Sequence, residues 1–134
     1  DSSTDLVILS TILCCVPCRQ EQKELVNEIH RILKPKGIVY LSDFLISDEP
    51  YYQSKYLQGL KDFEEMGIYT TAEGLTVRHH TTFWITKLFR NFDIQWLEQF
   101  DLKTMNNHPA RVICSIAQKK VLPNNKKFNP FFLC

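Results

Sequence analysis

The sequence predicts an α/β fold in which parallel strands are joined by crossover helices and a C-terminal antiparallel hairpin follows. Two patterns support this prediction. The first is an apolar segment at residues 6–9, an amphipathic segment at 20–33 and a second apolar segment at 38–41. The second is a pair of alternating segments, 93–104 and 111–118, separated by a short polar turn. A helix between two strands that are buried on both faces is typical of a parallel connection.

The first three elements follow from the spacing of their apolar residues. Leu-Val-Ile-Leu at 6–9 is uninterrupted, which favours a strand covered on both faces. Residues 20–33 place apolar side chains at helical spacing, and glutamates near the start suit the helix dipole. We expect Pro35 and Gly37 to end this helix before the second strand at 38–41.

The middle of the chain contains signals for two shorter helices. Asp48-Glu49-Pro50 is typical of a helix start, with an acidic cap and a proline in the first turn. Aromatic and leucine side chains then recur at helical spacing as far as Gly67. Residues 68–80 are polar, with a turn expected at Gly74, and residues 82–91 predict a short helix whose apolar face meets the sheet.

The two alternating segments at the C-terminal side predict a hairpin that closes one edge of the sheet. Residues 119–134 are basic, broken by proline and interspersed with aromatics, and we expect residues 121–134 to be a flexible tail. The remaining residues, 1–120, are expected to form one domain, as the length of 134 residues suggests.

Composition excludes several classes of protein. The net charge of +1 argues against a broad nucleic-acid-binding surface. No apolar run reaches the ~18 residues of a membrane span, and no signal-peptide pattern opens the chain. The five cysteines are odd in number and three of them are clustered, unlike a secreted disulfide framework. We therefore expect a cytoplasmic protein with no membrane partner.

Three parts of the sequence carry a resemblance to a known family: residues 5–17 (DLVILSTILCCVP), residues 29–43 (IHRILKPKGIVYLSD), and the motifs 78–80 (RHH) and 104–106 (TMN). They resemble, in that order, three parts of class I S-adenosylmethionine-dependent methyltransferases. These are the fourth strand with its loop, the helix, Lys-Pro-Gly-Gly turn and fifth strand, and two motifs of a bacterial subgroup. The resemblance implies a Rossmann-like fold in which residues 1–120 form the C-terminal portion of a methyltransferase domain.

The resemblance also implies a cofactor, S-adenosylmethionine, and a site. The carboxyl ends of parallel strands are where open α/β sheets bind ligands. By the resemblance, three residues just past the first strand line the methionine part of the cofactor: Ser10, Thr11 and Ile12. Asp43 ends the next strand at the same edge and is a candidate base for a protonated acceptor. His79 and His80 are further candidate bases, and neighbours on an extended segment point to opposite sides.

The family's glycine-rich loop has no counterpart here, because the four glycines at 37, 59, 67 and 74 lack its spacing. Such a loop lets the backbone approach a cofactor at a helix N-terminus. We therefore expect this chain to be inactive by itself, with the cofactor-binding half absent and the acceptor, a small molecule, unidentified.

Two other hypotheses remain open. Cys15-Val16-Pro17-Cys18 between a strand and a helix resembles a thioredoxin-like redox site, in which a helix N-terminus activates the first thiol. No second ligand pair is placed for a metal, so we predict none. Alternatively, the chain is a non-catalytic fragment that forms homo-oligomers through an exposed sheet edge at residues 6–9.

Overall fold

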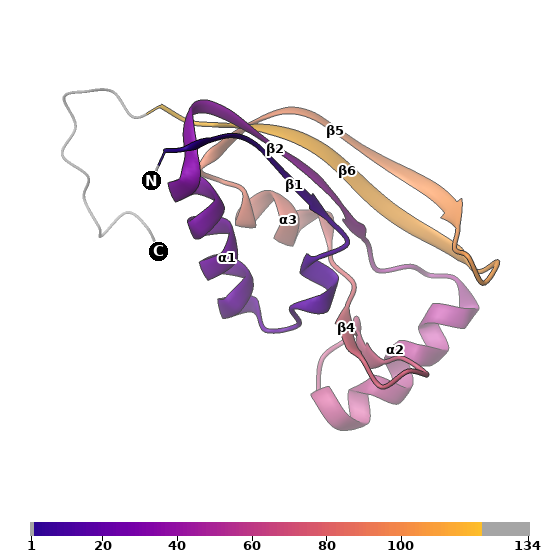
Figure 1. Ribbon diagram of the computed structural model, residues 1–134. Coiled ribbons are helices and arrows are strands. Elements are labelled where there is room, and N and C mark those ends of the chain that lie inside the picture. The colour runs from indigo at the N-terminus through magenta and orange to yellow at the C-terminus, as the bar shows by residue number, and fades with distance from the viewer. Residues whose placement is uncertain (1, 122–134) are drawn as a thin grey trace.

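A computed structural model describes residues 2–121 and contains a four-stranded sheet, a two-stranded sheet, three α-helices and a short 3₁₀-helix (Figure 1). In chain order the elements are β1 (Thr4–Ser10), η1 (Leu13–Cys15), α1 (Arg19–Ile32), β2 (Leu33–Phe44), α2 (Pro50–Phe63), β3 (Ile68–Thr70), β4 (Thr76–Arg78), α3 (Thr82–Leu88), β5 (Phe92–Lys103) and β6 (Pro109–Lys119). The expected tail lies almost wholly outside the described residues.

The four-stranded sheet has the order β1-β2-β6-β5. β1 runs parallel to β2, and its last residue, Ser10, lies opposite Ser42. β6 is antiparallel to both β2 and β5, so the C-terminal hairpin inserts β6 into the sheet and leaves β5 at the edge. The predicted strand–helix–strand unit and the hairpin are both confirmed.

The main core lies between one face of this sheet and the helices α1 and α3 (Figure 1). Val26 and Ile29 of α1 and Ile85 of α3 pack against the side chains of β2 and β6 that point the same way. The apolar spacing that predicted these helices therefore matches the faces they bury.

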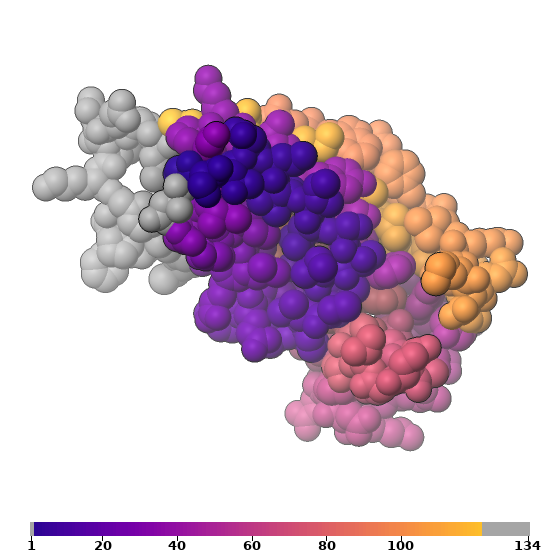
Figure 2. Space-filling model, viewed as in Figure 1, coloured from indigo at the N-terminus to yellow at the C-terminus, as the bar shows by residue number. Residues whose placement is uncertain are grey.

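The prediction that β1 is buried on both faces is wrong. Leu9 is buried, but Leu6 and Ile8 are 52% and 66% exposed. Their side chains point away from α1 and α3, and no described element covers that face of the sheet. β1 is also an edge strand, and its indigo atoms lie at the surface in Figure 2. An apolar run alone does not say which faces of a strand are covered.

The segment Lys34–Gly37 forms an irregularity at the start of β2 rather than the end of the helix. α1 ends at Ile32, and Leu33 already pairs with Thr4, after which the register shifts. Lys36 has φ 63°, in the left-handed region that suits glycine. Gly37 is needed for space, because a Cβ there would lie 2.8 Å from the carbonyl oxygen of Lys34.

Substitutions at these two neighbouring positions are expected to have opposite effects. Lys36→Gly should raise the free energy of unfolding by about 0.5–1 kcal/mol, since glycine adopts the left-handed conformation without the steric strain of a Cβ atom. Gly37→Ala should lower it by about 1–3 kcal/mol, since the new methyl group meets a backbone oxygen. Urea denaturation of both variants measures the difference, and a stabilising Gly37→Ala would contradict this account.

Residues 44–81 form a smaller unit beneath one end of the sheet, made of α2 and the β3–β4 hairpin. The segment 68–80, expected only to be polar with a turn, pairs Ile68 with Arg78, and Gly74 lies in the turn with φ 89°. The backbone of α2 approaches β3 closely at Gly59, where a Cβ would lie 2.0 Å from the carbonyl oxygen of Ile68. No helix among the described residues is long and apolar enough to cross a membrane.

Candidate functional site

The carboxyl ends of β1 and β2 lie together at one edge of the sheet. The backbone N–H of Thr11 donates to the carbonyl oxygen of Ser42 at 2.7 Å, and this bond turns the chain out of β1. Thr11 has φ 51°, and its hydroxyl donates to the carbonyl oxygen of Ser10. Ser10, Thr11 and Ile12 are all exposed, so the structure places the three predicted cofactor residues side by side on an open surface.

Asp43, at the end of β2, is fully buried and points toward the loop after β1. Its Oδ2 accepts a hydrogen bond from the backbone N–H of Cys14 at 3.2 Å, and its Oδ1 accepts one from the N–H of Phe44 at 2.8 Å. Burial raises the pKa of Asp43 to about 6, although both hydrogen bonds act to lower it. The carboxylate therefore joins η1 to the end of β2.

His80 is buried next to Asp43, with 3.9 Å between its Nδ1 and Oδ1 of Asp43. Nδ1 lies 3.2 Å from the carbonyl oxygen of Phe44, and Nε2 lies 2.9 Å from Nε2 of Gln22. The carbonyl needs a donor and the amide nitrogen needs an acceptor, so the imidazole is neutral with its proton on Nδ1. Burial also lowers its pKa to about 4.

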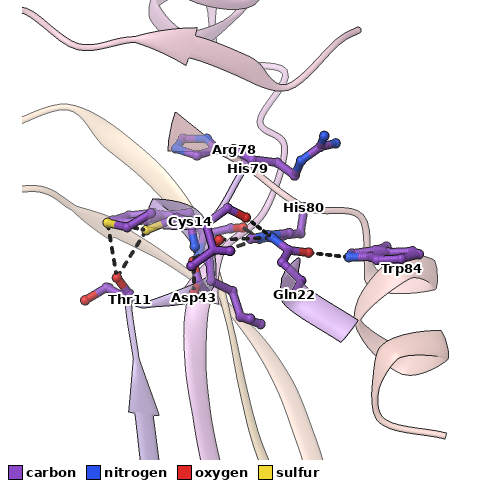
Figure 3. A network of polar contacts seen from close by, with 12 residues as sticks. Thr11, Cys14, Gln22, Asp43, Arg78, His79, His80 and Trp84 are labelled. Carbon is purple, nitrogen blue, oxygen red and sulfur yellow. Dashed lines mark hydrogen bonds and ion pairs between the residues drawn. The ribbon is translucent and has the colours of Figure 1, made fainter. Parts of the chain in front are cut away.

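Gln22 connects this site to both helices that cover the sheet, although the sequence did not single it out. The two N–H bonds of its amide nitrogen are shared among three acceptors: the carbonyl oxygens of Leu13 (3.0 Å) and Val16 (2.8 Å) and Nε2 of His80 (2.9 Å). Its Oε1 accepts from the indole N–H of Trp84 at 2.7 Å. Figure 3 shows Gln22 between His80 and Trp84. The sequence feature that points to Gln22 is its position on the apolar face of the predicted helix, because an amide buried there requires hydrogen-bond partners.

His79 points to the opposite side, as the alternation of an extended segment requires. Its Nδ1 lies 2.7 Å from the hydroxyl of Tyr56, which already accepts a hydrogen bond from the N–H of Ser47. The Tyr56 hydroxyl therefore donates to Nδ1, and the proton of the neutral ring is on Nε2, 3.4 Å from the hydroxyl of Tyr69. Burial lowers the pKa of His79 to about 4.

Arg78 binds the β3–β4 hairpin to the loop that precedes α1. It is 6% exposed, and its Nε donates to the carbonyl oxygen of Pro17 at 2.6 Å. Its Nη1 forms an ion pair with Glu65 at 2.8 Å, and Arg19 reaches the same carboxylate at 2.9 Å. The three consecutive side chains of the Arg-His-His motif therefore contact three different parts of the structure: the loop before α1, helix α2 and helix α1.

A cavity of about 240 Å³ lies on the His79 side of this motif, between α2, the β3–β4 turn and the β5–β6 turn. Aromatic side chains make up much of its wall: Phe44, Tyr51, Tyr52, Tyr69, His79 and His108. A larger cavity of about 310 Å³ lies between α1 and α3 and includes none of the predicted site residues. We call the smaller one the aromatic pocket.

The Cys-x-Pro-Cys segment spans the connection between η1 and α1. Cys15 closes η1, and Cys18 directly precedes the first residue of α1. Both are exposed and are free thiols. Cys15, the first thiol of the motif, is therefore not at the start of α1, where the redox hypothesis requires it. No group of ligands suited to a metal ion occurs within residues 2–121.

Comparison with known proteins gives a consistent result. A family model described as a methyltransferase domain matches residues 1–41. A SAM-dependent methyltransferase from Methanosarcina mazei is 26% identical with a TM-score of 0.82, and the match covers 89% of this chain and 60% of that one. The chain thus spans about three fifths of that protein's length. No curated protein matches the sequence.

Two more distant structures share the fold. The 1,6-didemethyltoxoflavin-N1-methyltransferase of Burkholderia thailandensis, solved with that compound and S-adenosylhomocysteine, is 16% identical with a TM-score of 0.62, covering 90% of this chain and 46% of that one. A putative methyltransferase from Bacillus halodurans is 13% identical with a TM-score of 0.59, covering 90% and 66%. The chain has the Rossmann-like fold of a class I S-adenosylmethionine-dependent methyltransferase domain, as its three sequence segments indicated.

Proposed function

We propose that this chain forms the acceptor side of a cytoplasmic methyltransferase that uses S-adenosylmethionine to methylate a small molecule. The observation that supports this most is the likeness to the Methanosarcina mazei protein, which extends over 89% of the chain at a TM-score of 0.82. The Burkholderia thailandensis structure, which contains the small molecule 1,6-didemethyltoxoflavin, supports the same class of acceptor. Portions of these proteins lie outside the match, so the activity of a whole enzyme is a proposal.

The loop after β1 fits one side of the cofactor. Ser10, Thr11 and Ile12 are exposed at the carboxyl edge of parallel strands, the usual position of ligands in open α/β sheets. S-adenosylmethionine, when bound, supplies a methyl group activated by its positively charged sulfur. The described residues hold no glycine-rich loop for the remainder of the cofactor, and we infer that such a unit must be supplied for binding.

The three predicted catalytic residues have separate roles in this proposal. Asp43 holds the loop after β1 directly, through the N–H of Cys14. His80 acts on the same loop through Gln22, whose amide reaches the carbonyl oxygens of Leu13 and Val16. Such groups are positioning residues. His79 lines the aromatic pocket and presents the N–H of Nε2 on that side, so it is our candidate for contact with the acceptor.

Calorimetric titration with S-adenosylmethionine tests the proposal. We expect no measurable binding by the chain itself, and binding by a chimera in which a glycine-rich strand–loop–helix unit of a methyltransferase precedes Thr4. In the chimera, Ile12→Arg should weaken binding by about tenfold or more, since it places a cation against the positively charged cofactor. Leu57→Ala, at an exposed position of α2, should leave binding unchanged. A folded chimera without affinity, or an Ile12→Arg variant that binds normally, would contradict the proposal.

A non-catalytic oligomer is the second candidate, and the exposed apolar side chains on the edge strand β1 favour it. The mass of the chain in solution, measured on the samples used for the titration, distinguishes this candidate. A folded monomer that also fails to bind cofactor in the chimera would exclude both.

A further inference from the structure

The aromatic pocket is assembled from three segments that are far apart in the sequence. Tyr51 and Tyr52 belong to the first turn of α2, Tyr69 belongs to β3, and His108 follows the β5–β6 turn. The rings of Tyr51 and His108 stack with centroids 3.7 Å apart, which holds the β5–β6 turn against α2. Figure 1 shows the tip of that hairpin beside the start of α2.

The rings at the base of the pocket are fixed before any ligand binds. His79 stacks on Phe44 at 5.2 Å with an angle of 20° between the rings, and the ring of Tyr52 lies 5.2 Å away. Tyr52 is 4% exposed, and the hydroxyl of Tyr56 holds His79 from behind. A preformed pocket loses little free energy to side-chain ordering when a ligand binds.

Charge and size indicate what such a pocket accepts. Its lining contains one ammonium group, Lys55, and one carboxylate, Glu73, so neither sign dominates. The nitrogen of Lys55 already lies 5.7 Å from the ring of Tyr51, which disfavours a second cation. The volume of about 240 Å³ is smaller than the roughly 300–1,000 Å³ of drug-sized sites, as expected for one or two rings.

The pocket also adjoins the edge where the proposed cofactor residues lie. Phe44, in its wall, follows Asp43 at the end of β2, and the backbone of Ser42 binds the N–H of Thr11. A ring bound in the pocket would therefore lie next to this edge of the sheet, on the same side as His79.

We propose that the aromatic pocket binds an uncharged, planar aromatic or heteroaromatic ring, and that such a ring is the methyl acceptor. The second half of this statement rests on the proposed function. Flat rings stack on the tyrosine, phenylalanine and imidazole faces, and polar substituents meet the hydroxyl of Tyr69, which lies 3.4 Å from Nε2 of His79.

A pair of probes with the same carbon skeleton tests the pocket without any cofactor. The 134-residue chain is titrated with 2-naphthol and with decahydro-2-naphthol, and binding is followed by nuclear magnetic resonance shifts of the chain. We expect 2-naphthol to bind about tenfold more tightly and to shift signals of Tyr52, Tyr69 and His79. Equal binding of the two probes, tighter binding of choline than of 2-naphthol, or shifts confined to other regions would overturn the proposal.

Variants then locate the site. Tyr52→Ala removes a buried ring and could prevent folding, so the main variant is His108→Ala, whose ring lies at the partly exposed β5–β6 turn. It should weaken 2-naphthol binding severalfold, and Leu57→Ala should not change it. Unchanged binding in His108→Ala and in a folded Tyr69→Leu variant would also overturn the proposal. Because these titrations contain no S-adenosylmethionine, loss of the pocket and loss of the methyltransferase assignment are separate outcomes.

Discussion

Replacement of Gln22 by leucine is expected to lower the free energy of unfolding by about 3 kcal/mol. Gln22 is fully buried, and its amide binds two backbone carbonyls and the rings of His80 and Trp84. Leucine has a similar size but makes none of these hydrogen bonds, and each buried group that is left without a partner costs about 1–3 kcal/mol. The carbonyl oxygen of Leu13 keeps its bond from the N–H of Val16, so the cost falls mainly on Trp84, His80 and Val16. Part of that cost should be recovered by relaxation and by the apolar side chain.

The control is the same substitution two residues earlier on the same helix. Gln20 is exposed, and its side chain donates a hydrogen bond to the exposed carboxylate of Glu24. Gln20→Leu should therefore change stability by less than about 0.5 kcal/mol. Urea denaturation gives both values, and the m-values show whether unfolding stays two-state. A Gln22→Leu variant that loses less stability than Gln20→Leu would refute the role assigned to this amide.

Stability is also expected to fall as the pH is lowered from about 6.5 to about 4, by roughly 3 kcal/mol in total. His79 and His80 are neutral in the folded state, where burial lowers each pKa from 6.5 to about 4. Between these two values the unfolded chain binds more protons than the folded chain, so acid favours unfolding. Each histidine contributes about 3 kcal/mol by this linkage.

Asp43 acts in the opposite direction. Its folded pKa of about 6 lies above the ordinary value of 3.8, so the native state takes up its proton first. The folded state therefore gains back about 2–3 kcal/mol as the pH falls from 6 toward 4, which leaves a net loss. His30, whose pKa is lowered by burial and by Lys119, adds to the loss.

Denaturation curves measured across this pH range check the prediction. His79→Gln and His80→Gln should each reduce the dependence on pH, because glutamine does not titrate. They should do so whatever their effect on stability at neutral pH. Asp43→Asn should steepen the loss, since it removes the compensating group. Profiles that stay parallel to the unsubstituted chain in all three variants would contradict the assignment of these groups.

The helices and the longer strands follow from local periodicity. The apolar residues of α1 recur at helical spacing, β2 carries an apolar run, and β5 and β6 are the two alternating segments predicted as a hairpin. These patterns depend on how side chains project from a helix or a strand, which is a property of a few consecutive residues. The likeness of short motifs to methyltransferases was sufficient to predict the Rossmann-like class.

One feature of the site, the opposite orientation of two neighbouring histidines, was also predicted from the sequence. Adjacent histidines in an extended segment must face opposite ways, and His79 and His80 do. It could not say that His79 meets Tyr56 and that His80 meets Gln22, because these partners are 23 and 58 residues away along the chain. Nor could it show that Asp43 is buried against Cys14 instead of facing a ligand.

Only the tertiary structure decided the surroundings of each residue. Leu6 and Ile8 belong to an apolar run, yet they are exposed because β1 is at the sheet edge and no described element covers their face. The aromatic pocket exists because α2, β3 and the β5–β6 turn meet in space. Local sequence determines which way a side chain points relative to its own backbone. Burial, pKa and pocket walls depend on what the rest of the chain brings to that side, and this is why they emerged only with the fold.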